Sequence, residues 1–279
     1  MSKIRTSWQI AKQCWRVLML DKELLIFPIV SAIAMLLVIA SFALPIWGSG
    51  LLEHVHDHPQ ADRPILFAIS FAFYLVSYFV IIFFNSALVS CALIRLRGGN
   101  PTVADGFRGA MKCLPAIFGW ALLSAVVGMI LQSLEQRVGL IGRLVISLIG
   151  VAWAIASYFA IPVIVTENVG PVEALKRSAS LIRKTWGETL TVQVGLSLVA
   201  VAAGFVTMLV IIGGGALMPM SPVLGGSLMV LGILGFFCGI VVTATLHAIL
   251  TSALYLYAED GKVPANFDGE LFKGAFALK

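Results

Sequence analysis

Long apolar runs constrain the fold of this chain more than any other feature. A helix of about 18–20 apolar residues can cross the hydrocarbon of a bilayer. Six segments contain such runs: 24–47, 65–97, 114–131, 144–165, 190–212 and 227–258. Only 12% of the 279 residues are charged, and the mean hydropathy is +0.99. The sequence therefore predicts an all-α, polytopic membrane helical bundle of about six transmembrane helices.

Residues 171–186 are the most distinctive segment between these runs. At about 100° per residue, Ala174, Leu181 and Ile182 share one face of a helix and the basic residues share the other. Pro171 suits the first turn, and Gly187 predicts where the helix ends. We expect this helix to lie on the cytoplasmic membrane surface, with its cations at lipid phosphates: Lys176, Arg177, Arg183 and Lys184. The alternative is a soluble-type helix packed on a core.

Two further segments, 8–19 and 103–113, show the same separation of apolar and basic faces. The first carries Lys12 and Arg16 and the second carries Arg108 and Lys112. Thr102 precedes the second segment, with Asp105 at capping-box spacing. A cleaved signal peptide is the competing interpretation of the N-terminus, but its polar region and its apolar run are both too long. All three helices are expected to form a partial basic collar on the cytoplasmic face.

The order of these segments predicts an internal repeat. A surface helix followed by two spans occurs three times, over residues 7–97, 102–166 and 171–258, and a polar cytoplasmic tail follows over 259–279. We expect residues 1–279 to form a single integral membrane domain with this threefold pseudo-repeat.

Lysine and arginine predict the orientation. If the N-terminus is cytoplasmic, 16 of the 19 fall on the cytoplasmic side and only Arg63, Arg137 and Arg143 fall outside. This bias places both termini in the cytoplasm. The net charge of +5 indicates anionic lipid as a partner rather than nucleic acid, because aromatic residues are not interleaved with the basic ones.

Three alternating histidines lie in the polar loop between the first two spans. His54, His56 and His58 would point the same way in an extended segment, and with a neighbouring carboxylate they could hold a divalent metal. The alternative is a solvated turn, because the loop shows no pattern of supporting residues.

Two polar residues within the spans are candidate functional residues. Asn85 can form a hydrogen bond between helices, either for packing or for transport. His247 lies between Thr243 and Thr251, which can share its face. A neutral histidine bonded to hydroxyl groups is one interpretation, and contact with a ligand or a polar pathway is the other.

No known catalytic motif is present in the sequence. It contains no HExxH, GxSxG, Walker loop or paired acidic residues within a span, so we expect no enzymatic activity and no cofactor. The four cysteines are far apart and form no CxxC pair. They are expected to act as small apolar side chains.

Several motifs resemble those of an uncharacterised family of bacterial six-span membrane proteins, a domain of unknown function. They lie at residues 7–16, 21–28, 96–102 and 170–179. The resemblance implies a multi-pass protein of the bacterial inner membrane and brings no activity. Residues 173–178 and 184–186 are more loosely similar to the membrane domain attached to some glycerophosphodiester phosphodiesterases. Because this chain lacks their catalytic barrel, no phosphodiesterase residue is carried over.

Two classes of function follow from these observations. The first is a non-enzymatic membrane protein that engages anionic lipid through its basic collar and serves a protein partner or a second copy of itself. The second is a transporter or channel for a small molecule or lipid. Pro28, Pro162 and the Gly-rich connection expected over 213–226 would then supply broken helices around a site near the bilayer midplane.

Overall fold

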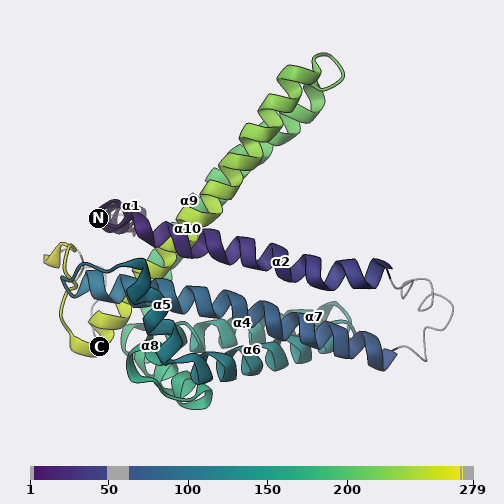
Figure 1. Cartoon of the computed structure of the whole chain (residues 1–279). Helices are drawn as coiled ribbons and strands as arrows, with labels where there is room; N and C mark the ends of the chain where they lie inside the picture. The colour runs from purple at the N-terminus through teal and green to yellow at the C-terminus, as the bar shows by residue number, and fades with distance from the viewer. Residues whose placement is uncertain (1–2, 49–62, 271, 273–279) are drawn as a thin grey trace. The chain divides into compact units, whose positions relative to one another are not determined.

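The protein is built from helices, as the computed structural model shows (Figure 1). The structure describes residues 3–48, 63–270 and 272, and side chains within 8–48, 64–184, 200–270 and 272. No strand occurs among these described residues. The helices are α1 (Lys3–Leu20), the 3₁₀ helix η1 (Lys22–Leu25), α2 (Ile26–Gly48), α4 (Arg63–Leu96), α5 (Val103–Lys112), α6 (Leu114–Glu135), α7 (Leu140–Ala156), α8 (Ala160–Glu167), α9 (Pro171–Leu217) and α10 (Pro222–Asp260).

Six described helical segments are long and apolar enough to cross a membrane, which confirms the predicted fold class. They are Lys22–Gly48, Pro64–Leu96, Leu114–Glu135, Leu140–Glu167, Ala200–Leu217 and Pro222–Asp260. Many of their large apolar side chains are exposed in the structure, as expected for surfaces that face lipid. The threefold repeat and the surface position of the basic helices stay predictions.

The contacts divide the chain into two compact units. Unit 1 comprises Met1–Leu25, Ala92–Pro101 and Arg183–Lys279, and unit 2 comprises Ile26–Cys91 and Thr102–Ile182. Helices α4 and α9 each contribute to both units. That residues 1–279 act as a single domain stays a prediction.

Unit 1 is organised around the C-terminal half of α10. The α10 residues from Ala248 to Ala258 are buried apart from Thr251, and α1 packs against this helix. On α1 the side chains of Ile10, Cys14 and Val17 are fully buried. The predicted division of α1 into an apolar and a polar face is wrong at Gln13, which is 8% exposed. Gln13 lies next to Cys14 on the buried side of α1. A side-chain amide is therefore buried where α1 packs against α10.

Unit 2 contains α2, α5, α6, α7 and α8 together with most of α4. The predicted capping box of α5 is confirmed, because Thr102 Oγ1 accepts from the Asp105 amide at 3.3 Å and Asp105 Oδ2 accepts from the Thr102 amide at 3.1 Å. The pKa of Asp105 is lowered, and the main cause is the hydrogen bond that its carboxylate accepts from the Thr102 hydroxyl. Gly106 is buried where a Cβ atom would lie 2.5 Å from Phe27 and 2.8 Å from the Ala87 carbonyl, so α5 packs closely on α2 and α4.

The fourth span is interrupted, whereas the sequence analysis predicted one helix over 144–165. Helix α7 ends at Ala156 and α8 begins at Ala160. Pro162 lacks the amide hydrogen that would bond to the carbonyl of Tyr158, and its ring would clash there. The chain therefore leaves the α-helical path at Ser157–Phe159, and the Phe159 amide donates instead to Ser178 Oγ of α9 at 2.9 Å.

Two predicted boundaries around α9 are also wrong. This helix does not end at Gly187 but continues from Pro171 to Leu217, and the Gly-rich segment 213–226 is helical except for a turn at 218–221. Glycines in this segment bring two helices together: a Cβ atom on Gly214 would lie 2.8 Å from the Gly225 carbonyl. Helices α9 and α10 therefore form a tight antiparallel hairpin (Figure 1).

Candidate functional site

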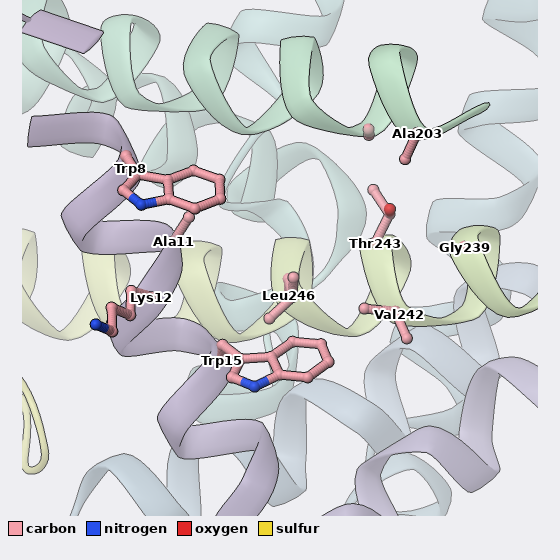
Figure 2. Close-up of a pocket in the computed structure, with 10 residues that line it drawn as sticks. Trp8, Ala11, Lys12, Trp15, Ala203, Gly239, Val242, Thr243 and Leu246 are labelled. Carbon is pink, nitrogen blue, oxygen red and sulfur yellow. The ribbon is translucent and has the colours of Figure 1, made fainter. Parts of the chain in front are cut away.

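Unit 1 contains a pocket of about 420 Å³ between α1 and the α9–α10 hairpin (Figure 2). It is called the α1 pocket below. Ten residues from the three helices line it: Trp8, Ala11, Lys12, Trp15, Ala200, Ala203, Gly239, Val242, Thr243 and Leu246. Apart from Lys12, Thr243 and the two indole nitrogens, these side chains are apolar, so the pocket suits a largely apolar ligand.

Helix α1 supplies one wall with a stripe of four residues. Trp8, Ala11, Lys12 and Trp15 follow the spacing i, i+3, i+4, i+7, which places them on one face. Figure 2 shows both indole rings extending from α1 toward the hairpin, while the amine of Lys12 points outward at the rim. Trp8 is 59% exposed and Trp15 44% exposed, so neither belongs to the buried core of unit 1. The stripe therefore combines two flat apolar rings with a cation at the edge.

The hairpin supplies the opposite wall with small residues. Ala203 and Gly239 leave space, and no described atom would lie within 4 Å of a Cβ atom on Gly239. The wall continues into a second pocket of about 360 Å³ that shares Ala200, Ala203, Gly239 and Thr243 and extends to Thr207 and Gly235. From Leu246 to Gly235 the helical rise is about 16 Å. The two adjoining pockets are together called the apolar groove below.

The predicted lipid-binding cations lie in both units. Lys12 and Arg16 of α1 and Arg183 and Lys184 of α9 belong to unit 1, whereas the other four belong to unit 2: Arg108, Lys112, Lys176 and Arg177. All are exposed except Arg177, which is half-buried. Arg177 Nε donates to Glu167 Oε1 at 3.3 Å, and Arg108 Nη1 donates to Asp105 Oδ1 at 2.8 Å. A collar that joins cations of both units stays a prediction.

The other predicted site residues are separate from the α1 pocket or outside the described chain. His247 is half-buried on α10, one turn after Thr243, which lines the pocket. Asn85 is half-buried on α4 and lines a cavity within unit 2. The predicted metal ligands His54, His56 and His58 lie outside the described residues. Among the described residues, no group of three histidine, cysteine, aspartate or glutamate side chains is placed to hold a metal ion.

A buried ionic cluster in unit 1 was missed by the sequence analysis. Arg95 donates two hydrogen bonds to the carboxylate of Asp21, from Nε and Nη2, and Nη2 also donates to Asn100 Oδ1 at 2.6 Å. The side chains of Arg95 and Asp21 are only 16% and 9% exposed. The two residues are 74 positions apart in the chain, so no local pattern in the sequence could indicate this pair.

Cys14 is expected to be unreactive while the protein is folded. Burial raises the pKa of its thiol to about 12 from an ordinary value of 9.0, which leaves about a thousandfold less reactive thiolate at pH 8. Maleimide labelling at pH 8, followed by peptide mapping, should modify Cys14 only after denaturation in SDS. Rapid modification of Cys14 in the native protein would show that α1 is not packed on α10 as described.

A protein-family model described as a family of unknown function, DUF6159, matches residues 64–265. The chain belongs to the DUF6159 family. No curated protein and no solved structure matches the chain, so the looser similarity to phosphodiesterase membrane domains gains no support. In this DUF6159 protein, the matched segment includes the hairpin wall of the α1 pocket and all of α4 to α8 except Arg63, whereas the α1 wall precedes it.

Proposed function

We propose that this DUF6159 protein is a non-enzymatic, multi-pass protein of the bacterial inner membrane that binds an anionic phospholipid in the α1 pocket. The observation that carries the proposal is the outward amine of Lys12 at the rim of an apolar groove flanked by Trp8 and Trp15 (Figure 2). In this arrangement the groove binds one acyl chain of the lipid, and the amine of Lys12 binds the phosphate of the same molecule.

Charge, rather than chain burial, would select the lipid. A lipid that leaves the bilayer for the groove exchanges one apolar environment for another, so burial of its chain contributes little net free energy. A basic residue near an anionic membrane surface contributes about 1 kcal/mol. Arg16, one helical turn after Lys12 and also exposed, doubles this contribution. The two indoles suit the polar–apolar boundary at which a headgroup lies.

The proposed orientation follows from the distribution of lysine and arginine. With both termini in the cytoplasm, α1 lies at the inner leaflet, where anionic lipids interact with basic helices. Lys176, Arg177, Arg183 and Lys184 would extend the same preference along α9. A bound lipid at this position can present its headgroup to a protein partner or to a second copy of the chain.

Removal of both α1 cations tests the proposal. Lys12→Gln with Arg16→Gln should weaken binding of phosphatidylglycerol by roughly 30-fold, because two contributions of about 1 kcal/mol are lost. Binding of zwitterionic phosphatidylcholine should not change. The measurement is native mass spectrometry of the purified full chain titrated with each lipid.

Arg137→Gln with Arg143→Gln is the matched control. It removes the same charge from exposed residues on the predicted outer side and should leave phosphatidylglycerol binding within about twofold of the unmodified protein, since distant surface charges are screened. Equal losses in the two double variants would refute a specific site at α1, because they would show that only the net charge matters.

A carrier for a small molecule is the second candidate function. The observation in its favour is the interruption of the fourth span at Ser157–Phe159, because breaks within spanning helices are typical of substrate sites in transporters. For a carrier of this kind, His247→Ala should change the flux or the proton coupling in proteoliposomes. An unchanged flux would remove this residue from the pathway.

A further inference from the structure

Unit 2 contains a cavity of about 430 Å³ beside the interruption of the fourth span. It is called the span cavity below. Three spans supply its walls, and the lining residues are Tyr78, Ile81, Ile82 and Asn85 of α4, Trp120, Ser124, Val127, Gly128 and Leu131 of α6, and Trp153, Ser157, Tyr158 and Ile161 of the α7–α8 segment. All of these residues lie within unit 2.

The span cavity lies well inside the apolar segments rather than at their ends. Asn85 is about 16 Å along α4 from Leu96, and Ser124 is about 15 Å along α6 from Leu114, at 1.5 Å per residue. The break caused by Pro162 turns Ser157 and Tyr158 out of a regular helix at the same place. Irregular backbone within a span is tolerated where it lines a cavity or is covered by protein.

Three polar side chains in this lining lack a hydrogen-bond partner among the described residues. Among the described residues, the structure shows no hydrogen bond made by the side chains of Tyr78, Asn85 or Ser124, which are all half-buried beside the cavity. By contrast, neighbouring Tyr74 donates to Gln132 Oε1 at 3.1 Å and Ser157 Oγ donates to the Trp153 carbonyl at 2.7 Å. The span cavity thus offers hydrogen bonds that the described chain does not use.

The shape and charge of the lining restrict what can occupy it. Trp120 and Trp153 stack with their ring centroids 5.9 Å apart and their planes at 9°, and Trp153 remains half-buried beside the cavity. Its indole offers a flat apolar surface for another ring. None of the described lining residues is charged, so an ion here would be left uncompensated in a low-dielectric environment. A phosphate or carboxylate is therefore excluded.

We propose that the span cavity binds an uncharged planar molecule that carries hydrogen-bonding groups on its edge. One face of the molecule lies against the Trp153 indole, and its polar edge bonds to Asn85, Tyr78 and Ser124. This site is independent of the lipid proposal, because it shares no residue with the α1 pocket.

Three related probes test the ligand class. 2-Naphthol is planar and uncharged and has a hydroxyl group, naphthalene lacks that group, and naphthalene-2-sulfonate carries a charge. Equilibrium dialysis of the full chain in nanodiscs should show that 2-naphthol binds best and that the sulfonate does not bind at the site. Asn85→Leu preserves the size of the side chain and should reduce affinity for 2-naphthol by about tenfold, which is the effect of one neutral hydrogen bond. Its weaker affinity for naphthalene should not change.

A second variant and a matched control complete the test. Ser124→Ala should also weaken binding of 2-naphthol, whereas Ser147→Ala on the exposed side of α7 should not. Size-exclusion profiles and thermal unfolding show whether each variant is folded. The probes also partition into the lipid of the nanodisc, but this background is the same for every variant and cancels when the amounts of bound probe are compared. Equal 2-naphthol binding by the unmodified protein, Asn85→Leu and Ser124→Ala would overturn the proposal. Sulfonate binding as tight as that of 2-naphthol would overturn it as well.

Discussion

Replacement of Asp21 by asparagine is expected to lower the free energy of unfolding by about 3–5 kcal/mol. The carboxylate of Asp21 accepts two hydrogen bonds from Arg95, and the pair is largely buried. Asparagine leaves the guanidinium of Arg95, whose side chain is only 16% exposed, without its counter-charge. Such a loss is a large part of the stability of a typical domain.

Thermal and SDS unfolding of the detergent-purified chain measure this effect. Asp21→Leu with Arg95→Met should cost less than Asp21→Asn alone, because no buried charge remains. Glu167→Gln is the matched control: it breaks the Glu167–Arg177 pair, whose side chains are 31% and 37% exposed, and should cost less than about 1 kcal/mol. Equal losses for Asp21→Asn and Glu167→Gln would contradict the cluster described in unit 1.

Substitution of Gly225 by alanine is expected to open the α9–α10 hairpin and to destabilise the protein by about 3 kcal/mol. A Cβ atom at this position would lie 2.7 Å from the Gly214 carbonyl oxygen and 2.7 Å from the Met218 amide nitrogen. Both are backbone atoms, so the contact cannot be relieved by a change of rotamer. The two helices have to move apart at the end where the turn joins them.

The adjacent glycine provides a direct control. No described atom would lie within 4 Å of a Cβ atom on Gly226, and alanine favours a helix over glycine by up to about 1 kcal/mol. Gly226→Ala should therefore be neutral or stabilising in the same unfolding assay. If Gly225→Ala and Gly226→Ala have equal effects, the hairpin is not held by close contact of α9 and α10.

The six spans could be predicted from sequence because hydrocarbon imposes a simple rule. A spanning helix needs enough consecutive apolar residues, and its own backbone satisfies its hydrogen bonds. This rule identified α4 nearly to the residue, over 65–97 against Arg63–Leu96. It missed the break before Pro162 because a hydropathy count ignores the absent amide of proline. The proline itself was the signal, and the transporter alternative already used it as a helix break.

The Gly-rich segment 213–226 was misinterpreted for a different physical reason. In water, a run such as Gly213–Gly215 favours a loop, because glycine costs helix stability. In a span, unpaired backbone groups cost more than the glycine does, so the helix continues and the missing side chains become a packing surface. The sequence signal was the lack of charge in this segment rather than its glycine content.

The candidate sites were only partly predictable. Lys12 and Asn85 were selected because a basic face and a polar residue within a span are visible in local sequence. Neither cavity could be predicted, because each joins helices that are distant in the chain. The α1 pocket combines Trp15 with Leu246, and the span cavity combines Tyr78 with Trp153. No periodicity identifies such neighbours.

Photo-crosslinking with a phosphatidylglycerol that carries a diazirine on one acyl chain tests the central claim most directly. The full chain in nanodiscs is irradiated with this lipid, and the modified peptides are mapped by mass spectrometry. The lipid proposal predicts that crosslinks concentrate on residues 8–15 of α1 and 239–246 of α10, and that excess unlabelled phosphatidylglycerol competes for them. Crosslinks spread in proportion to exposure, with Leu36 and Leu148, 66% and 61% exposed, modified as much as the groove, would contradict it.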